Sequence, residues 1–398
     1  MQELPASLAG HRVRTSRLQS VRVGEVRYAP AKSIWFLGMS GAAVAGGLAT
    51  ATFDAVLLFL AATTCVLLLG HSLGSHRKLI HDSYQCPKWL EYFLVYCGVQ
   101  VGLAGPLGLM RQHELRDYAQ RLPDCHDYLR HGKPFWLDAW WQLNCELRLA
   151  HPPSIAIEPR VAEDRFYRFL ERTWMLQQLP WALAFFLWGG WAYVFWGTCA
   201  RVTAGVFGHW LIGYFAHNQG EMRYRVDGAA VQGRNIRFTS LITMGECWHN
   251  NHHAFPGSAR LGLHPGEWDP GWWVLMLLRR ASLVWDVRLP RDLPARPELE
   301  ALRACSSRDR PREPFIEAPV AAALSLRILR ALTGTRIALW QNPDTTRLRL
   351  HMNGTIVRGL PALCLALGQR SGGARMLALC MLPIACAFEK TRTALEME

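Results

Sequence analysis

The chain has 398 residues, half of them apolar and 17 of them Trp, which is enough for one large domain or two ordinary ones. Lys and Arg (44) outnumber Asp and Glu (31), and the arginines cluster before the first apolar segment and between the later ones, as in the cytoplasmic loops of a membrane protein. No basic stripe alternates with aromatic residues, so we expect no nucleic-acid partner. The 11 cysteines form no C-x-x-C pair, which argues against a disulfide framework, and the polar, Arg-rich start of the chain predicts no cleavable signal peptide.

Four apolar segments approach the roughly 20 residues that cross a bilayer. Segments 33–50 and 53–70 are almost contiguous and predict a first helical hairpin. Segments 176–196 and 197–216 predict a second hairpin, with Arg201 near its bend at the far interface. With the Arg-rich N-terminus on the cytoplasmic side, both hairpins return the chain to the cytoplasm.

A fifth apolar stretch, 89–110, has the length of a span but contains Glu91, Gln100 and Pro106. The segments that flank it carry histidines, and these can serve one site only if the stretch dips into the membrane or lies on it. The predicted fold class is therefore an all-α, multi-pass integral membrane protein. It has two transmembrane helical hairpins (four spans) and a cytosolic helical cap that carries the histidines on the cytoplasmic face.

The remaining segments complete the predicted organisation. Residues 274–288 are typical of an interfacial amphipathic helix. We expect a cytosolic N-terminal segment (1–32), a membrane domain (33–290), a polar linker rich in Pro and Arg (291–314) and a C-terminal region of unassigned function (315–398). Within the last region, 336–360 predicts short strands around Asn-Pro-Asp and Asn-Gly turns.

Two histidine patterns lie beside the predicted spans. His71 and His76 form H-x4-H, and His249, His252 and His253 form H-x2-H-H. Positions i, i+3 and i+4 of a helix share one face, so we expect the last three imidazoles to converge on one point. Neutral imidazole is a common ligand of iron, copper, nickel and zinc.

Residues outside these two patterns also bear on the site. His217 ends the fourth span, and Glu246 is placed to orient the ring N–H groups of ligands. A lone histidine at a helix end is more often an ordinary surface or core residue, and we interpret four positions in this way: His81, His151, His209 and His351.

The two patterns resemble those of the membrane fatty-acid desaturases of the acyl-CoA and acyl-lipid type, which carry H-x4-H and then two H-x2-H-H boxes. The stretch "GECWHNNHHAFPGSARLGL" is similar to their third box, and "DPGWW" and "WDVRLP" fit the tail of the family. The resemblance covers roughly residues 33 to 290. In the second box His113 matches, but Arg116 and Asp117 stand where the family has histidines.

The departure changes the ligand set that the resemblance implies. Arg116 stays protonated and cannot bind a metal, whereas the carboxylate of Asp117 can. The implied metal ligands are His71, His76, His113, Asp117, His217, His249, His252 and His253, with Glu246, His126 and Asp124 as residues that hydrogen-bond to them. His126 and His131 are also candidates to replace a lost ligand.

The resemblance implies two non-haem iron ions that activate O2 and remove hydrogen from a methylene of a fatty acyl chain, which gives a cis double bond. The substrate would be an acyl-CoA or an acyl-lipid in the bilayer. No nucleotide-binding motif is found, so an external electron donor is expected, a ferredoxin or a cytochrome-b5-type carrier. Two alternatives stay open: a related di-iron lipid hydroxylase, and a catalytically degenerate lipid-binding protein, which the changes at Arg116 and Asp117 would support.

Overall fold

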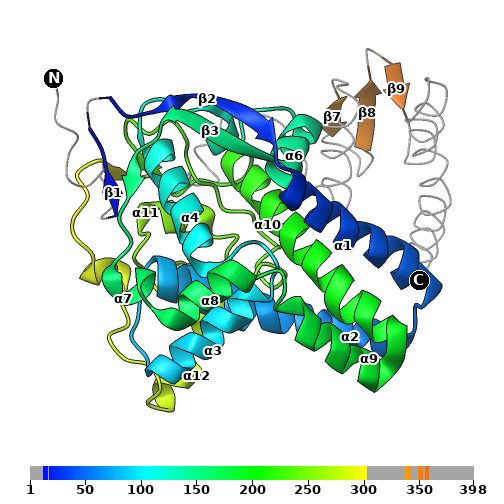
Figure 1. Ribbon diagram of the computed structural model, residues 1–398. Coiled ribbons are helices and arrows are strands. Elements are labelled where there is room, and N and C mark those ends of the chain that lie inside the picture. The colour runs from blue at the N-terminus through cyan, green and yellow to red at the C-terminus, as the bar shows by residue number, and fades with distance from the viewer. Residues whose placement is uncertain (1–11, 17, 303–336, 342–347, 353–354, 358–398) are drawn as a thin grey trace. The chain divides into compact units, whose positions relative to one another are not determined.

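The computed structural model describes residues 12–16, 18–302, 337–341, 348–352 and 355–357, and the chain divides into two units, Met1–Ala304 and Cys305–Glu398. The first unit is mostly helical (Figure 1). Its helices are α1 (Pro30–Ala49), α2 (Phe53–Cys65), the π-helix η1 (Val66–Ile80), α3 (Lys88–Val99), α4 (Pro106–Arg121), α5 (Asp127–Arg130), α6 (Phe135–Asn144), α7 (Pro159–Ala162), α8 (Arg165–Thr173), α9 (Gln178–Val194), η2 (Phe195–Ala200), α10 (Arg201–Asn218), α11 (His249–Ala254), α12 (Pro270–Arg280) and η3 (Pro290–Asp292).

Short antiparallel strand pairs connect segments that are far apart in the sequence. The pairs are β1 (Val13–Arg14) with β4 (Ser154–Ile155), β2 (Ser20–Tyr28) with β3 (Cys145–His151), and β5 (Tyr224–Val226) with β6 (Leu299–Ala301). In the second unit, β7 (Ile337–Gln341), β8 (Leu348–Met352) and β9 (Thr355–Val357) form an antiparallel sheet in the order β7-β8-β9. The strands predicted within 336–360 are therefore confirmed.

Among the described residues, two helical stretches are long and apolar enough to cross a membrane, Phe53–Ile80 and Gln178–Asn218. The second stretch reverses direction at Gly189 and Gly190, whose backbone angles are not helical. Two contacts between its arms require this reversal. A Cβ on Gly197 would lie 2.8 Å from the ring of Phe185, and Arg201 Nη2 donates to Gln178 Oε1 at 2.5 Å.

The chain therefore does reverse within this stretch, but at Gly189 and Gly190 and not near Arg201, where the bend was predicted. Arg201 lies within the returning arm, where it is buried and also donates to the carbonyl oxygens of Gly197 and Gln100. An unbroken apolar run does not mark its own point of reversal, and here a Gly-Gly pair provides it. The positive φ of Gly190, 66°, is a conformation that glycine adopts without strain.

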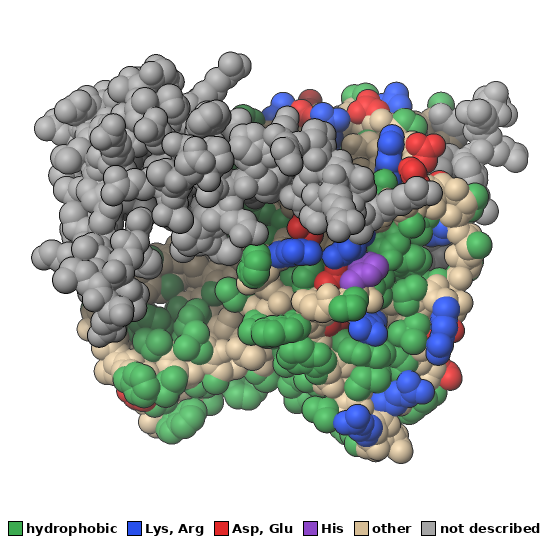
Figure 2. All heavy atoms as spheres, turned by 180° about the vertical axis from the view of Figure 1, so that it is seen from behind, with side chains coloured by type: hydrophobic (Ala, Val, Ile, Leu, Met, Phe, Trp, Pro, Cys, Tyr) green, Lys and Arg blue, Asp and Glu red, His purple; other side chains and the backbone are tan. Residues whose placement is uncertain are grey.

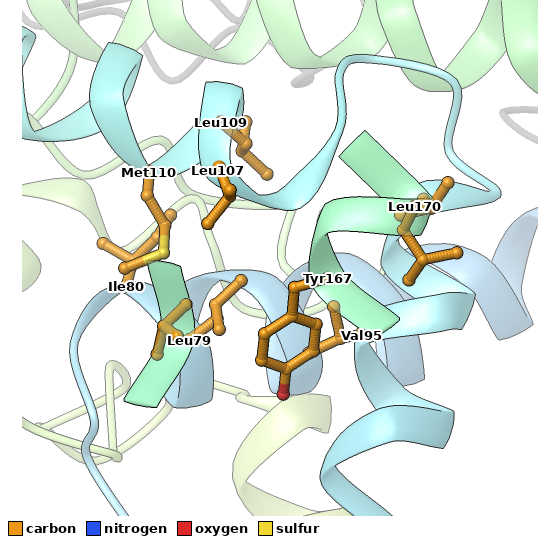
Figure 3. Close-up of a cluster of buried hydrophobic side chains, with 10 residues drawn as sticks. Leu79, Ile80, Val95, Leu107, Leu109, Met110, Tyr167 and Leu170 are labelled. Carbon is orange, nitrogen blue, oxygen red and sulfur yellow. The ribbon is translucent and has the colours of Figure 1, made fainter. Parts of the chain in front are cut away.

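The apolar stretch 89–110 is not one helix. It is divided between α3 and α4, with a non-helical segment over 100–105. α3 packs directly on η1, because a Cβ on Gly70 or Gly74 would lie 2.3 Å from the backbone of Cys97 or Leu94. Leu79, Val95, Met110, Tyr167 and other apolar side chains from η1, α3, α4 and α8 form a buried cluster beside this contact (Figure 3).

Arg12 ties the start of the described chain to the end of η1. Its guanidinium is buried and pairs with Glu114 at 2.6 Å and Glu158 at 3.0 Å, and it donates to the carbonyl oxygen of Ile80. This network fixes the C-terminal end of η1 against α4. Both elements carry histidines at this junction, so the contact positions the candidate site.

One further prediction is corrected here. α12 spans Pro270–Arg280, so the helix predicted over 274–288 begins four residues too late and ends eight residues too late. Within the predicted linker 291–314, Leu299–Ala301 pairs with β5 and Arg296 donates to the carbonyl oxygens of His253 and Ala254.

The surface carries large apolar side chains on the long helices. Leu48, Phe53, Leu183 and Leu187 are each at least 60% exposed. Figure 2 shows hydrophobic side chains gathered over the lower part of one face, with many charged side chains above them or toward one edge. Exposed apolar area of this kind is typical of a surface that meets lipid or another apolar partner.

Candidate metal centre

Four histidines from three helical regions form the first group. One ring nitrogen each from His76, His81, His113 and His252 lies within 4.8 Å of those of the other three. His76 is in η1, His81 comes directly after it, and α4 and α11 supply the other two. The ring centroid of His252 lies 4.6 Å from that of His76 and 4.8 Å from that of His81.

The π-helical register of η1 explains how His76 and His81 meet. In an α-helix, residues five apart differ in direction by about 140° and face different sides. A π-helix closes i→i+5 hydrogen bonds, which bring such residues one above the other. The N–H of His81 donates to the carbonyl oxygen of His76 at 3.1 Å, and the two ring centroids are 4.8 Å apart.

Glu246 holds the ring of His76 from outside the group. Its Oε2 lies 2.6 Å from His76 Nδ1, its Oε1 accepts from Ser72 Oγ at 2.6 Å, and Arg77 Nη2 lies 3.8 Å away. Burial opposes ionisation of this carboxyl, yet His76 and Arg77 hold its pKa below the usual range. A carboxylate on Nδ1 leaves Nε2 of His76 to face the group, which is the usual support of a metal-binding histidine.

His217, His249 and His253 form the second group, and their donor nitrogens also lie within 4.8 Å of one another. His249 Nε2 is 3.1 Å from His217 Nε2 and 3.0 Å from His253 Nε2. His217 Nδ1 is held by the carbonyl oxygen of Gly213 at 2.7 Å. The second group adjoins the first, because the ring of His252 lies 5.6 Å from that of His249.

The H-x2-H-H motif therefore does not converge on one point, and the expectation drawn from its spacing is wrong. His249 and His253 face the second group, and His252 faces the first. The motif lies on α11, a single short helix that stands between the two groups and supplies both.

The two asparagines within the motif fix α11 in place. Asn250 Nδ2 donates to the carbonyl oxygens of Tyr224 and Gly233, and its Oδ1 accepts from the N–H of Tyr224. Asn251 Nδ2 donates to the carbonyl oxygen of Leu261 and to Glu267 Oε2. Gly233 lets the backbone approach closely, since a Cβ there would lie 2.8 Å from the ring of His253.

The other predicted site residues lie outside both groups. His71 is 6.3 Å from His76 between ring centroids and packs edge-on against His209 at 5.0 Å. Asp117 Oδ2 lies 3.8 Å from His113 Nδ1 and 3.3 Å from Arg121 Nη2. Burial opposes ionisation of Asp117, but His113, Arg121, His253 and His249 hold its pKa well below the usual range, so the carboxylate is charged and close to both groups.

His126 and Asp124 have local roles. His126 is the N-cap of α5, where its Nδ1 accepts from the N–H of Tyr128 at 3.1 Å. Asp124 is half exposed and lies 3.5 Å from Arg22 and 3.8 Å from Arg130. These contacts account for both residues without a ligand to orient.

The interpretation of His81 as an ordinary helix-end residue is wrong. The segment contains two overlapping H-x4-H spacings, His71–His76 and His76–His81, and the structure brings the second pair into the first group. The repeated spacing was the available signal. Of the other histidines interpreted in this way, His151 is exposed in β3, His209 packs against His71, and the side chain of His351 lies outside the described residues.

Burial favours the neutral form of His81, His113, His249, His252 and His253. It lowers the pKa of His113 and His249 to about 4 and the pKa values of His81, His252 and His253 well below the usual range. Neutral imidazole is the form that binds metal.

The residues present fit a metal ion. Within the part of the chain that the structure describes, Nε2 of His81, Nδ1 of His113 and both ring nitrogens of His252 are buried with no hydrogen-bond partner. A buried polar atom without a partner costs roughly 1–3 kcal/mol. Coordination of a cation would satisfy such nitrogens, and in the second group it would separate nitrogens that otherwise face one another at hydrogen-bond distance.

Comparison with known proteins identifies a family. The fatty acid desaturase family model matches residues 52–266. The sn-1 stearoyl-lipid 9-desaturase of Anabaena variabilis is 37% identical over 226 residues, which cover 56% of this chain and 79% of that protein. The enzyme of the same name from Synechocystis sp. is 34% identical over 231 residues (56% and 69%), and an acyl-CoA 5-desaturase of Anemone leveillei is 31% identical over 228 residues (56% and 68%).

The matched region contains all seven histidines of the two groups, and both stretches long enough to cross a membrane start within it. Family membership, the paired histidine groups and the apolar helices agree with one another. The chain belongs to the fatty acid desaturase family, membrane-associated oxidoreductases, and its function is that of a fatty acyl desaturase.

Proposed function

We propose that the two histidine groups hold two iron ions, one in each group. The first ion would be bound by His76, His81, His113 and His252, and the second by His217, His249 and His253. The carboxylate of Asp117, which lies beside His113 and whose charge acts on His249 and His253, would complete the second set. His71 is not part of this proposed set, because its ring packs on His209 instead. The observation that carries the proposal is the convergence of imidazoles in two groups, the first of which has buried ring nitrogens with no hydrogen-bond partner among the described residues.

Bound iron supplies the activation of dioxygen that removal of hydrogen from an unactivated methylene requires. The chain supplies the environment. Neutral imidazoles would leave the positive charge of bound metal ions in place, and the carboxylates of Asp117 and Glu246 would offset part of it. Glu246 fixes the ring of His76, and the asparagines of α11 fix His249, His252 and His253.

We further propose that the long helices form two transmembrane hairpins (four spans) and that the remaining helices form a cytosolic cap. The exposed apolar side chains of α1, α2 and α9 and the Arg-rich start of the chain support this topology. The proposed domains keep their predicted limits: 1–32, 33–290, 291–314 and 315–398. The substrate is an acyl-CoA or an acyl-lipid, as in the named relatives, and the electron donor a ferredoxin or a cytochrome-b5-type carrier.

The test measures iron content and products of the same purified sample. Protein purified in detergent with iron supplied should contain about two irons per chain and should desaturate acyl substrates when an electron donor is added. His252→Ala should lower the iron content and abolish product, whereas His151→Ala, at an exposed histidine of β3, should change neither.

Each outcome separates the alternatives. Normal product formation by His252→Ala would refute the metal assignment. Iron at full content with hydroxylated rather than unsaturated product would favour the lipid hydroxylase. Protein that is folded, binds lipid and takes up no iron would favour a lipid-binding protein.

A further inference from the structure

Arg116 places a fixed positive charge beside the second group. Its Nη1 donates to the carbonyl oxygen of Leu129 at 3.0 Å and lies 2.8 Å from His131 Nε2, and its Nη2 donates to Gln142 Oε1 at 2.9 Å. None of these partners carries a negative charge. Burial lowers the pKa of Arg116 from its usual value, but a guanidinium stays protonated in a protein.

His131 links this charge to the second group. Its Nδ1 lies 2.8 Å from Asp138 Oδ2, which also accepts from Trp210 Nε1 at 2.8 Å. Because Arg116 can only donate, His131 Nε2 accepts from it and Nδ1–H donates to Asp138. The ring of His131 stacks on that of His217, with centroids 5.5 Å apart and planes 12° from parallel.

The arrangement of His131 is that of a metal-binding histidine, except that a guanidinium takes the place of the metal. A carboxylate orients one ring nitrogen, and the other nitrogen presents its lone pair to a cation. Asp138 and His131 are both buried, so the orientation is firmly held.

The two groups therefore differ in both ligands and charge. The first has four imidazoles, and one of its rings is supported by Glu246. The second has three imidazoles and the proposed ligand Asp117, and the nearby Arg116, which has no carboxylate among its hydrogen-bond partners, opposes the negative charge that Asp117 supplies. A divalent ion in the second group is repelled by this charge, and repulsion at close range inside a protein is weakly screened.

We propose that Arg116 makes the second group the weaker of the two metal positions, so that the four-histidine group fills first. The inference rests on the proposed two-metal function, and it deepens that function by assigning unequal affinities. Replacing Arg116 by a neutral residue should raise the metal affinity of the second group. Part of this gain would arise because His131 Nε2 no longer accepts a hydrogen bond from Arg116 and is free to face the second group.

The experiment titrates the metal-free full chain in detergent with cobalt(II), a spectroscopic probe for imidazole ligation. The wild-type chain should show two steps. Arg116→Gln should lower the dissociation constant of the second step by ~10-fold or more and leave that of the first step unchanged. Arg116→Lys keeps the charge and should remain like the wild type, and Arg111→Gln, at an exposed arginine on the same helix, is the matched control. His81→Ala and His217→Ala assign the first and second steps to their groups.

The outcomes separate this inference from the proposed function. Two steps of equal affinity in the wild-type chain, or a second step that Arg116→Gln leaves unchanged, would overturn the role of Arg116 while two metal positions remain. No cobalt binding in the wild type would overturn both. The first step of Arg116→Gln reports whether that variant is folded. A wild-type chain in which the second group fills first would overturn the inference whatever the variant does.

Discussion

Replacement of Glu246 by Gln tests how the first group is oriented. Glu246 lies 2.6 Å from His76 Nδ1 and accepts from Ser72 at 2.6 Å. Gln keeps the shape and one acceptor oxygen but removes the negative charge. Residues that support a metal-binding histidine typically contribute 10–100-fold to metal affinity, which corresponds to about 1.4–2.7 kcal/mol. Because Gln retains an acceptor for His76 Nδ1–H, we expect metal affinity to fall by about tenfold, the lower end of this range. Glu246→Leu removes the acceptor as well, so metal affinity should fall by about a hundredfold.

The assay is a cobalt(II) titration against a competing chelator, with each step measured separately. The weakening should be larger for the four-histidine group, since Glu246 contacts His76 directly, whereas only its charge acts on His249 of the second group. The reasoning would be refuted if both steps weakened equally, which would indicate a general loss of structure, or if neither variant weakened the first step.

Three further predictions concern other residues. His81→Ala should remove the metal from the first group, measured as metal per chain, whereas His71→Ala should leave it in place; the reverse result would restore the original H-x4-H assignment. Asp117→Ala should lower metal content in the second group and Asp117→His should preserve it, and an unchanged content in Asp117→Ala would remove this residue from the site. Gly74→Ala should lower the free energy of unfolding by about 1–3 kcal/mol, because its Cβ would lie 2.3 Å from Leu94 O, while Gly38→Ala, with open space around it, should not; equal denaturation midpoints would contradict the packing argument.

Features that depend on local sequence were predicted well. The apolar helices, the strands within 336–360 and the placement of His249, His252 and His253 on one helix arise from patterns within a few turns of chain. The resemblance to the family was drawn from the same short motifs. The features that were missed depend on the helical register, α or π, or on contacts between segments that are distant in the sequence.

The assignment of His81 shows the first limit. The spacing of five residues is visible in the sequence, but it identifies a shared face only if the helix is wound as a π-helix, and the sequence pattern does not specify that register. The division of the H-x2-H-H motif shows the second limit. The separation of His252 from His249 and His253 depends on the position of His76 and His217, which lie in other helices.

Arg116 shows a further limit of the same kind. The sequence identifies it as a residue that cannot bind metal, and it does not reveal His131 and Gln142 as its partners. Those partners lie on the segment after α4, and only the folded arrangement brings them to the guanidinium.

The π-helical register of η1 also determines which insertions or deletions would keep the histidines of the centre together. A π-helical turn holds one residue more than the α-helical turn it replaces. Loss of one residue between His76 and His81 would leave them at i, i+4, a spacing that shares a face in an ordinary α-helix. Two chain lengths can thus present the same pair of imidazoles, which gives evolution a route to insert or delete a residue inside a metal centre without separating its ligands.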